Sequence, residues 1–237
     1  MGRTRQTQIC KRLRIRRLHP WDVSIEGAKK IQEELRAQII TDQRQITTNR
    51  IRKISAVDVA YLDEKAKVVV CIFDFPDLNL LEKITFTKNV KFPYIPGLLS
   101  FREGPLILEA FGRIRLKPDL ILFDGQGIMH PRRMGIATHL GIILDTPTIG
   151  CAKNYLYGEF RLPGEKRGDY RFVYDRKTKE IIGAVLRTKD RVRPVFVSIG
   201  FKVDLPAAIR IVLKTTKSSR IPEPLRFVHH LTRDYQT

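Results

Sequence analysis

Near the start of the chain, apolar residues recur at the three- and four-residue spacing of a helix. They are Ile25, Ala28, Ile31, Leu35 and Ile39. This pattern predicts an amphipathic helix, which Asp22 or Ser24 is placed to cap. The period then changes to runs of β-branched residues separated by short polar turns. These runs predict three antiparallel strands, at residues 54–62, 66–75 and 82–90.

Further along the chain, helical and strand-like patterns alternate. Helices are expected at residues 106–116, where Lys117-Pro118 ends the pattern, at 131–144, which begins with a proline, and from about Asp204. Short apolar or β-branched runs predict further strands. They lie at residues 119–123, 146–152, 171–175, 181–186 and 195–199. Strands followed by alternating strands and helices predict an α/β protein with a mixed sheet covered by helices.

The composition indicates a class of partner only through its charge. Of the 237 residues, 43% are apolar and 29% charged, which suits one folded domain, but Lys and Arg exceed Asp and Glu by 19. This excess favours nucleic acid as a partner, because neutralising phosphates releases their counterions. The alternative is a solvated basic surface. Residues 1–20 hold seven Lys or Arg and no acid, which predicts a basic arm before a folded domain at residues 21–237.

The cysteines and the lengths of the apolar runs predict where the protein works. The chain has an odd number of cysteines, and they lie far apart in sequence, at Cys10, Cys71 and Cys151. This argues against a disulfide framework and against a zinc module. No apolar run reaches the roughly 20 residues of a membrane helix. We therefore expect a cytoplasmic protein with no membrane partner.

Candidate chemistry lies in acids that interrupt or end apolar segments. Asp58 lies in AVDVAY and Asp124 in ILFDGQG, and Glu103 lies in the proline-rich segment 92–105. A carboxylate in an apolar run is costly unless it is paired or binds a cation. Three converging acids without cysteine suit a hard cation such as Mg²⁺, and in a basic protein this predicts metal-assisted phosphodiester hydrolysis. Taken singly, each acid is better explained as a helix or turn cap.

Several longer segments together resemble the endonuclease V family of repair nucleases. In the family's order they are VDVAY (57–61), PYIPGLLSFREGP (93–105), DGQGIMHPRRMGIATHLG (124–141), GCAK (150–153), SIGFKVDL (198–205) and RIPEPLRFVHHL (220–231). They cover most of the chain beyond the basic arm. The resemblance implies a ribonuclease H-like α/β fold and identifies residues 21–237 as the catalytic domain.

The resemblance also implies a set of catalytic residues. Asp58 and Asp124 match direct metal ligands, and Glu103 completes the acidic cluster, directly or through water. Lys153 is implied to place a positive charge near the phosphate or its nucleophile, and His130 to orient a phosphate or the leaving oxygen. Without the family match, Lys153 is an ordinary surface lysine at even odds, and His130 is a helix-start residue. The implied cofactor is Mg²⁺, with Mn²⁺ as a substitute.

The PYIP segment is similar to the family's strand-separating wedge. Pro93 and Pro96 fix two φ angles, so Tyr94 is presented on a stiff ridge and can replace a flipped base in the stack. An isolated PYIP would instead predict a buried aromatic. The other residues implied to contact nucleic acid are Ile95, Gly97, Leu99, Gly125, Gly127, Arg132 and Gly135. Hypoxanthine presents an acceptor at O6 and a donor at N1, the reverse of adenine, and backbone groups can read that reversal.

The resemblance implies a monomeric enzyme that acts on DNA containing deoxyinosine. It implies hydrolysis of the second phosphodiester bond 3′ to the lesion, which leaves 3′-hydroxyl and 5′-phosphate ends. One alternative is cleavage of inosine-containing RNA, and another is a non-catalytic lesion-binding protein. Phe201 supports the last alternative, because the family usually has histidine after SIG or SVG. We expect activity, with Phe201 beside the acidic cluster and affecting efficiency and metal preference.

Overall fold

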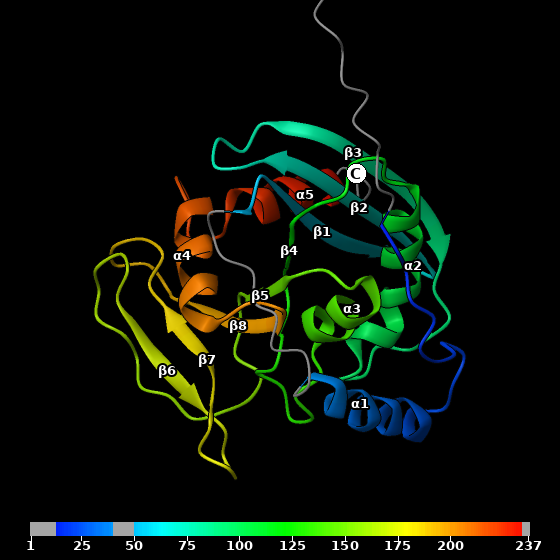
Figure 1. The fold of residues 1–237 in the computed structure, drawn as a ribbon, viewed down its shortest axis with the longest axis horizontal. Coiled ribbons are helices and arrows are strands. Elements are labelled where there is room, and N and C mark those ends of the chain that lie inside the picture. The colour runs from blue at the N-terminus through cyan, green and yellow to red at the C-terminus, as the bar shows by residue number, and fades with distance from the viewer. Residues whose placement is uncertain (1–12, 40–49, 234–237) are drawn as a thin grey trace, which may run out of the picture.

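The computed structural model describes residues 13–39 and 50–233. In this part of the chain, strands form one mixed sheet in the order β3-β2-β1-β4-β5-β8-β7-β6, with β3 and β6 at its two edges (Figure 1). The strands are β1 (Lys53–Leu62), β2 (Lys65–Asp74), β3 (Leu80–Asn89), β4 (Leu120–Phe123), β5 (Thr148–Ala152), β6 (Tyr170–Tyr174), β7 (Ile181–Leu186) and β8 (Val195–Phe201). β4 pairs in parallel with β1 and β5, and the other neighbouring strands are antiparallel.

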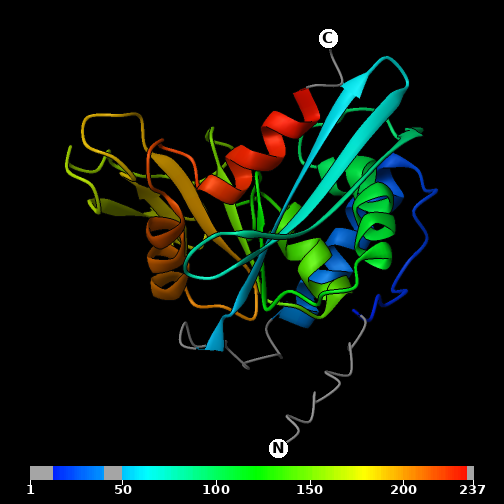
Figure 2. The same cartoon turned by 90° about the horizontal axis from the view of Figure 1, so that it is seen from above.

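Helices cover both faces of the sheet (Figure 2). They are α1 (Ile25–Ile39), α2 (Leu99–Arg113), α3 (Ile136–Leu144), α4 (Leu205–Thr215) and α5 (Glu223–Arg233). Ile121 packs with α2 and α3, whereas its neighbour Leu122 packs with α4 and α5. β4 is therefore apolar at every position because it is buried on both faces. The predicted mixed sheet flanked by helices is confirmed.

The predicted strands agree with the structure to within two residues at each end. The predicted first helix is also confirmed, and Ser24 caps it: the Ser24 hydroxyl oxygen accepts a hydrogen bond from the Gly27 N–H at 3.1 Å.

Two helix boundaries were wrong. α2 begins at Leu99, well before residue 106, and contains Pro105. A proline lacks only its own N–H, so the helix continues past it at a local cost. α3 begins at Ile136 and not at Pro131, because the preceding loop folds back on itself: the Gly135 N–H donates to the Gly127 carbonyl at 3.0 Å.

The sequence analysis did not predict α5. Pro222 and Pro224 mark this segment as a turn, although Leu225, Val228 and Thr232 recur at helical spacing and are buried against the sheet. This helix matters for the site, as described below.

Part of the predicted basic arm packs against the domain. Leu13, Ile15 and Leu18 contact the apolar cluster of α2 and α3, and the Arg16 N–H donates to the Ile143 carbonyl at 2.9 Å. The rest of the arm, residues 1–12, lies outside the described residues. The domain division at residue 20 and the arm's contact with phosphates stay predictions. No helix in the described ranges is long and apolar enough to cross a membrane.

Candidate active site

Two acids occupy matching positions on adjacent parallel strands. Val57 of β1 pairs with Phe123 of β4, so Asp58, which lies within β1, is beside Asp124, which follows the end of β4. The carboxyl ends of parallel strands are the usual ligand-binding edge of an α/β sheet. The structure therefore brings together the two acids that the sequence analysis assigned to a metal.

The carboxylate of Asp58 is oriented by α5. The Thr232 hydroxyl donates to Asp58 Oδ2 at 2.7 Å, and His229 Nδ1 lies 3.1 Å from the same oxygen. Sequence analysis missed both residues because it did not predict the helix that carries them. The signal was the helical spacing from Leu225 to Thr232, which places His229 next to the buried stripe.

Asp124 is paired with a cation from the next strand. Lys153 follows β5, which is parallel to β4, and its Nζ lies 2.5 Å from Asp124 Oδ2. Both side chains are partly exposed, so the ammonium group faces the same solvent-accessible edge as the acids.

Glu103 joins this cluster from α2. The Tyr61 hydroxyl donates to Glu103 Oε1 at 3.0 Å. Burial, together with the negative charges of Asp58 and Asp124, raises the pKa of Glu103 to about 8, although the Tyr61 hydrogen bond and Arg102 act in the opposite direction. Burial and Glu103 also raise the pKa of Tyr61. The three acids therefore share one electrostatic environment.

The chemistry of this donor set fits a hard divalent cation. It offers carboxylate oxygens and no thiolate, and the pKa of Glu103 is raised first by burial and then by the charges of Asp58 and Asp124, both of which a bound cation would offset. Among the residues that the structure describes, no three His, Cys, Asp or Glu side chains already form a group that could hold a metal ion. Asp58, Asp124 and Glu103 are instead engaged by α5, Lys153 and Tyr61, respectively.

The ridge formed by residues 93–97 is fixed at Gly97. The Gly97 carbonyl oxygen accepts hydrogen bonds at 3.0 Å from His130 Nε2, Arg132 Nη2 and Gln32 Nε2. Gly97 has a φ of 81°, a conformation that favours glycine. Three side chains from two distant segments therefore hold one backbone group of the ridge.

His130 and Arg132 direct their hydrogen-bonding groups toward the ridge and toward each other. His130 donates through Nε2, and its Nδ1 accepts from the Arg132 N–H at 3.1 Å, so the ring is the neutral Nε2–H tautomer. Burial lowers the pKa of His130 to about 4. Arg132 Nε donates to Gln32 Oε1 at 2.6 Å. In this arrangement both side chains position the ridge, and His130 also lines the pocket described below. The roles of His130 at a phosphate and of Arg132 at nucleic acid stay predictions.

Sequence analysis missed Gln32, although the signal was present. Gln32 lies between Ala28 and Leu35 on the buried stripe of α1, and it is 1% exposed. A buried glutamine must find partners, and Gln32 finds them in the carbonyls of Gly97 and Met134, each at 3.0 Å.

Asp58, Glu103 and Asp124, with Lys153, form what we call the acidic edge of the sheet. A pocket of about 380 Å³ lies between the ridge and this acidic edge. Tyr94, Gly97, Asp124 and Lys153 are among its lining residues. Tyr94 is 69% exposed, so the alternative of a buried aromatic was wrong. Other predicted contact residues also line the pocket, namely Ile95, Pro96, Leu99, Gly125 and Gly135.

Three predicted contact residues lie outside the lining of this pocket: Pro93, Gly127 and Arg132, the last of which binds the ridge as described above. Pro93 faces a second pocket beside Arg102. Gly127 is a packing residue: its N–H donates to the Ser198 hydroxyl oxygen at 2.7 Å, and a side chain there would collide with the Ile199 backbone. The close approach to β8 therefore explains the glycine, and its contact with nucleic acid stays a prediction.

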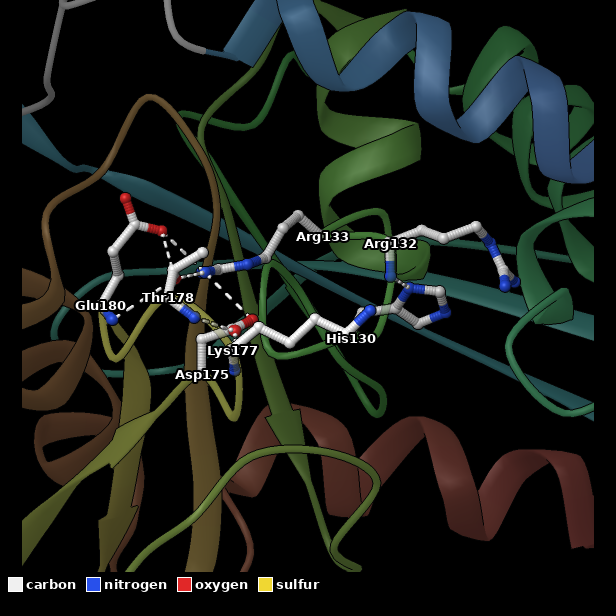
Figure 3. A network of polar contacts seen from close by, with 7 residues as sticks. All are labelled: His130, Arg132, Arg133, Asp175, Lys177, Thr178 and Glu180. Carbon is white, nitrogen blue, oxygen red and sulfur yellow. Dashed lines mark hydrogen bonds and ion pairs between the residues drawn. The ribbon is translucent and has the colours of Figure 1, made fainter.

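Arg133 ties the site loop to the β6–β7 turn. It points away from Arg132, its neighbour in the sequence (Figure 3). Its Nη2 lies 3.1 Å from Asp175 Oδ2 and 2.8 Å from Glu180 Oε2. The Arg133 and Asp175 side chains are 10% and 7% exposed, so this is a largely desolvated pair that fixes the turn relative to His130.

The expected location of Phe201 was wrong. β8 runs antiparallel to β5, so Phe201 pairs with Thr148 at the start of β5, whereas Lys153 follows the end of that strand. Phe201 is 4% exposed and packs with Leu35, Met134 and Ile142. It belongs to an apolar cluster and not to the acidic edge.

The fold and the acidic edge of the sheet define a nuclease of the ribonuclease H-like class. Comparison with solved structures agrees: endonuclease V from Bacillus subtilis has a TM-score of 0.88 at 31% identity, over 94% of this chain and 97% of that one. Endonuclease V from Ciona intestinalis, solved with a 24mer DNA containing an inosine followed by a ribo-adenosine, has a TM-score of 0.78 at 26% identity, over 90% and 97% of the two chains.

Sequence comparison identifies the family. The family model described as Endonuclease V matches residues 33–230. Endonuclease V from Dictyoglomus turgidum is 48% identical over 86% of this chain and 87% of that protein, and the one from Methanothrix thermoacetophila is 46% identical over 93% and 96%. The chain belongs to the endonuclease V family and is a nuclease that hydrolyses phosphodiester bonds.

Proposed function

We propose that this protein is a repair endonuclease that recognises deoxyinosine in DNA and hydrolyses the second phosphodiester bond 3′ to it. The products carry 3′-hydroxyl and 5′-phosphate ends, and the cofactor is Mg²⁺, which Mn²⁺ can replace. The observation that carries the proposal is the pocket between the exposed Tyr94 ridge and Asp124. A base turned into that pocket brings its backbone to the acidic edge. The similar Ciona protein was solved with inosine-containing DNA.

Each residue of the acidic edge has a distinct proposed role. Asp58, Asp124 and Glu103 hold the cation, which when bound supplies an activated water and neutralises charge on the phosphate. Lys153 places its ammonium group beside Asp124, where it stabilises negative charge on a phosphate oxygen. The hydrogen bonds from Thr232 and Tyr61 fix the orientation of Asp58 and Glu103.

The ridge separates the base from its neighbours. Tyr94 stacks in the gap that the flipped base leaves, and Gly97 cannot move away because three side chains hold its carbonyl group. Gly125 packs closely on α3, since a Cβ there would lie 2.7 Å from the Ile136 side chain, and it offers its backbone to the base from the pocket lining. Backbone donors and acceptors in the pocket read the O6 and N1 positions of hypoxanthine.

The cellular location and the oligomeric state are proposed from the cysteines and from the residues that build the site. Cys71 and Cys151 are free and buried, which supports a reducing, cytoplasmic location. We propose that the protein acts as a monomer, because one chain supplies the acids, the ridge and the pocket.

A nicking assay tests the proposal directly. Two labelled duplexes that differ only in deoxyinosine or deoxyadenosine at one position are incubated with Mg²⁺, with Mn²⁺ or with EDTA. We expect a metal-dependent nick one nucleotide beyond the lesion's own 3′ phosphodiester bond, in the inosine duplex alone. Binding without nicking in any metal would favour the non-catalytic alternative.

The nicking assay also tests RNA strands, because the DNA bound to the Ciona protein carries a ribo-adenosine after the inosine. Strands of the same sequence made of deoxyribonucleotides or ribonucleotides separate the two substrates. We expect faster cleavage of the DNA strand, and a faster RNA reaction would assign the protein to inosine-containing RNA instead.

A further inference from the structure

A row of aromatic side chains lies on one face of the edge strand β6. Tyr170, Phe172 and Tyr174 alternate along the strand and so point to the same side of the sheet. Their ring centroids are 5.5 Å and 6.5 Å apart, and the two tyrosines are 41% and 40% exposed. The free edge of β6 meets the preceding segment only at the Glu159–Tyr174 bridge within the described residues.

A groove of about 1090 Å³ runs along this edge, between β6 and residues 159–162. Arg161 and Arg171 line it and are exposed, and neither forms an ion pair with another described residue. Glu159 lies 2.7 Å from Lys179 Nζ, whereas Asp169 accepts from a neutral group, the Lys166 backbone N–H, at 3.0 Å. The two arginines therefore face one carboxylate without an ion pair among the described residues, and the net charge is positive.

The groove is joined to the active site by one short segment. Tyr155 and Leu156 follow Lys153 and line the pocket beside the ridge, and residues 159–162 line the groove. The Tyr155 ring lies 5.5 Å from that of Phe160, and Arg176 donates to the Tyr155 hydroxyl oxygen at 2.7 Å. Tyr155 and Phe160 pack on the face of the sheet that carries Phe196, whereas Phe172 packs with the α4 cluster on the other face. The segment therefore leads from the pocket to the edge of β6, where the groove begins.

The groove is also held in place relative to the site. Arg133 binds Asp175 and Glu180 in the turn after β6, and the same loop carries His130 at the ridge (Figure 3). A strand leaving the pocket would therefore meet a surface at a fixed position.

Exposed aromatic rows on an open sheet edge promote aggregation, and proteins seldom keep them without a use. Rings that accept stacking bases, with cations that follow a backbone, are the two components of single-strand binding surfaces. We propose that the groove along β6 binds single-stranded nucleic acid that continues from the strand in the active site. This inference rests on the proposed function, because it takes the pocket as the place where the strand enters.

The test measures affinity against strand length. Single strands of increasing length, with one inosine and in Ca²⁺ to prevent cleavage, are titrated by fluorescence anisotropy. Once the strand is long enough to reach β6, we expect affinity to rise, and Tyr170→Thr/Tyr174→Thr to remove about tenfold of that gain. Threonine keeps the β propensity of the strand. The matched control Tyr170→Phe/Tyr174→Phe retains the rings and should keep the gain.

A second variant tests the charge. Arg161→Gln/Arg171→Gln should make the plot of log affinity against log salt shallower by about 1.4 on long strands, since each phosphate contact on a single strand contributes about 0.7. Neither variant should change the nicking rate on a strand too short to leave the pocket. DNA and RNA versions of the long strand show which backbone the groove prefers.

Different results would refute the proposed function and the β6 inference. A wild-type protein that nicks no inosine strand in any metal refutes the proposed function. A wild type that nicks, with an affinity gain unchanged in both double variants, overturns the β6 inference. A change from dimer to monomer in Tyr170→Thr/Tyr174→Thr, seen by light scattering, would also overturn it, because the edge would then bind a second copy. Thermal melts confirm that each variant is folded.

Discussion

The acidic edge and the ridge lie on either side of one pocket, yet they are built in opposite ways. At the edge, burial and, to a smaller extent, the charges of Asp58 and Asp124 raise the pKa of Glu103 to about 8. At the ridge, the uncharged His130 and its partners saturate one carbonyl group, that of Gly97. The edge therefore has unfavourable interactions that a cation relieves, whereas the ridge has favourable ones already formed. Changes at the edge should lower activity without loss of stability, and changes at the ridge should lower both.

The largest effect is expected for Asp124→Asn. The substitution removes a charge and almost no volume, so cleavage should fall by at least about a thousandfold while the melting temperature stays near that of the wild type. Single-turnover nicking with Mg²⁺, measured beside a thermal melt, gives both values. Asp145→Asn is the matched control, because Asp145 is an exposed partner of Lys202 far from the pocket, and it should keep the wild-type rate. Near-normal turnover in Asp124→Asn would remove the metal-site assignment.

Glu103→Gln should lose cleavage nearly as completely and gain stability at high pH. The folded-state pKa of Glu103, about 8, lies above its ordinary value of 4.5, so the folded protein retains this proton where the unfolded chain has lost it. Wild-type stability should therefore fall as pH rises from about 4.5 to about 8 and remain low above that. Glutamine cannot titrate, so the variant should be more stable at pH 9 by on the order of 1–3 kcal/mol.

Melting at pH 5 and pH 9, with and without Mg²⁺, checks this expectation. Mg²⁺ should raise the melting temperature of the wild type at pH 9, because it binds the folded state and relieves the repulsion, and it should raise that of Glu103→Gln much less. Parallel curves for the two proteins across pH would show that Glu103 is not strained by its neighbours.

A smaller loss of activity is expected at the ridge, from Gln32→Met. Methionine keeps the volume but leaves the Gly97 and Met134 carbonyls without one donor each, at a cost of about 1–3 kcal/mol in stability. The ridge should loosen, and the nicking rate on duplex should fall more than the rate on single strands, where less stacking must be replaced. Lys29→Met, on the exposed side of α1, is the control. An unchanged melting temperature in Gln32→Met would mean that the three donors at Gly97 are redundant.

The same contrast shows how far the sequence could predict this site. The strands and the acids follow from local patterns: Asp124 comes directly after the apolar run of β4, whereas Asp58 lies within β1, which continues to Leu62 and not to an end at the acid. The contacts of Gln32 and His229 depend instead on which helix packs where, and short-range periodicity does not contain that information. Polar residues on buried helical stripes were the available signal, and they point to a partner without naming it.

Strand direction limited the prediction in a second way. Residues 195–199 were predicted as a strand, but the pattern of a strand is the same in either direction. Only the antiparallel pairing of β8 with β5 shows that Phe201 lies at the end away from Lys153. The family's histidine at this position therefore needs an explanation other than contact with the acids.

The smallest effect on activity is expected for Phe201→His. Phe201 is buried among Leu35, Met134 and Ile142, so histidine should leave a cavity and a poorly satisfied polar ring there, lowering stability by about 1–3 kcal/mol. The nicking rate should stay within about twofold of the wild type with both Mg²⁺ and Mn²⁺, because Phe201 pairs with Thr148 at the end of β5 away from Lys153. Phe201→Leu separates lost volume from added polarity, since it should cost less stability and leave the rate equally unchanged. A folded Phe201→His protein that is clearly faster with Mn²⁺ would show that this cluster communicates with the acidic edge, and Met134, which lines the pocket and packs on Phe201, is the residue through which that effect would travel.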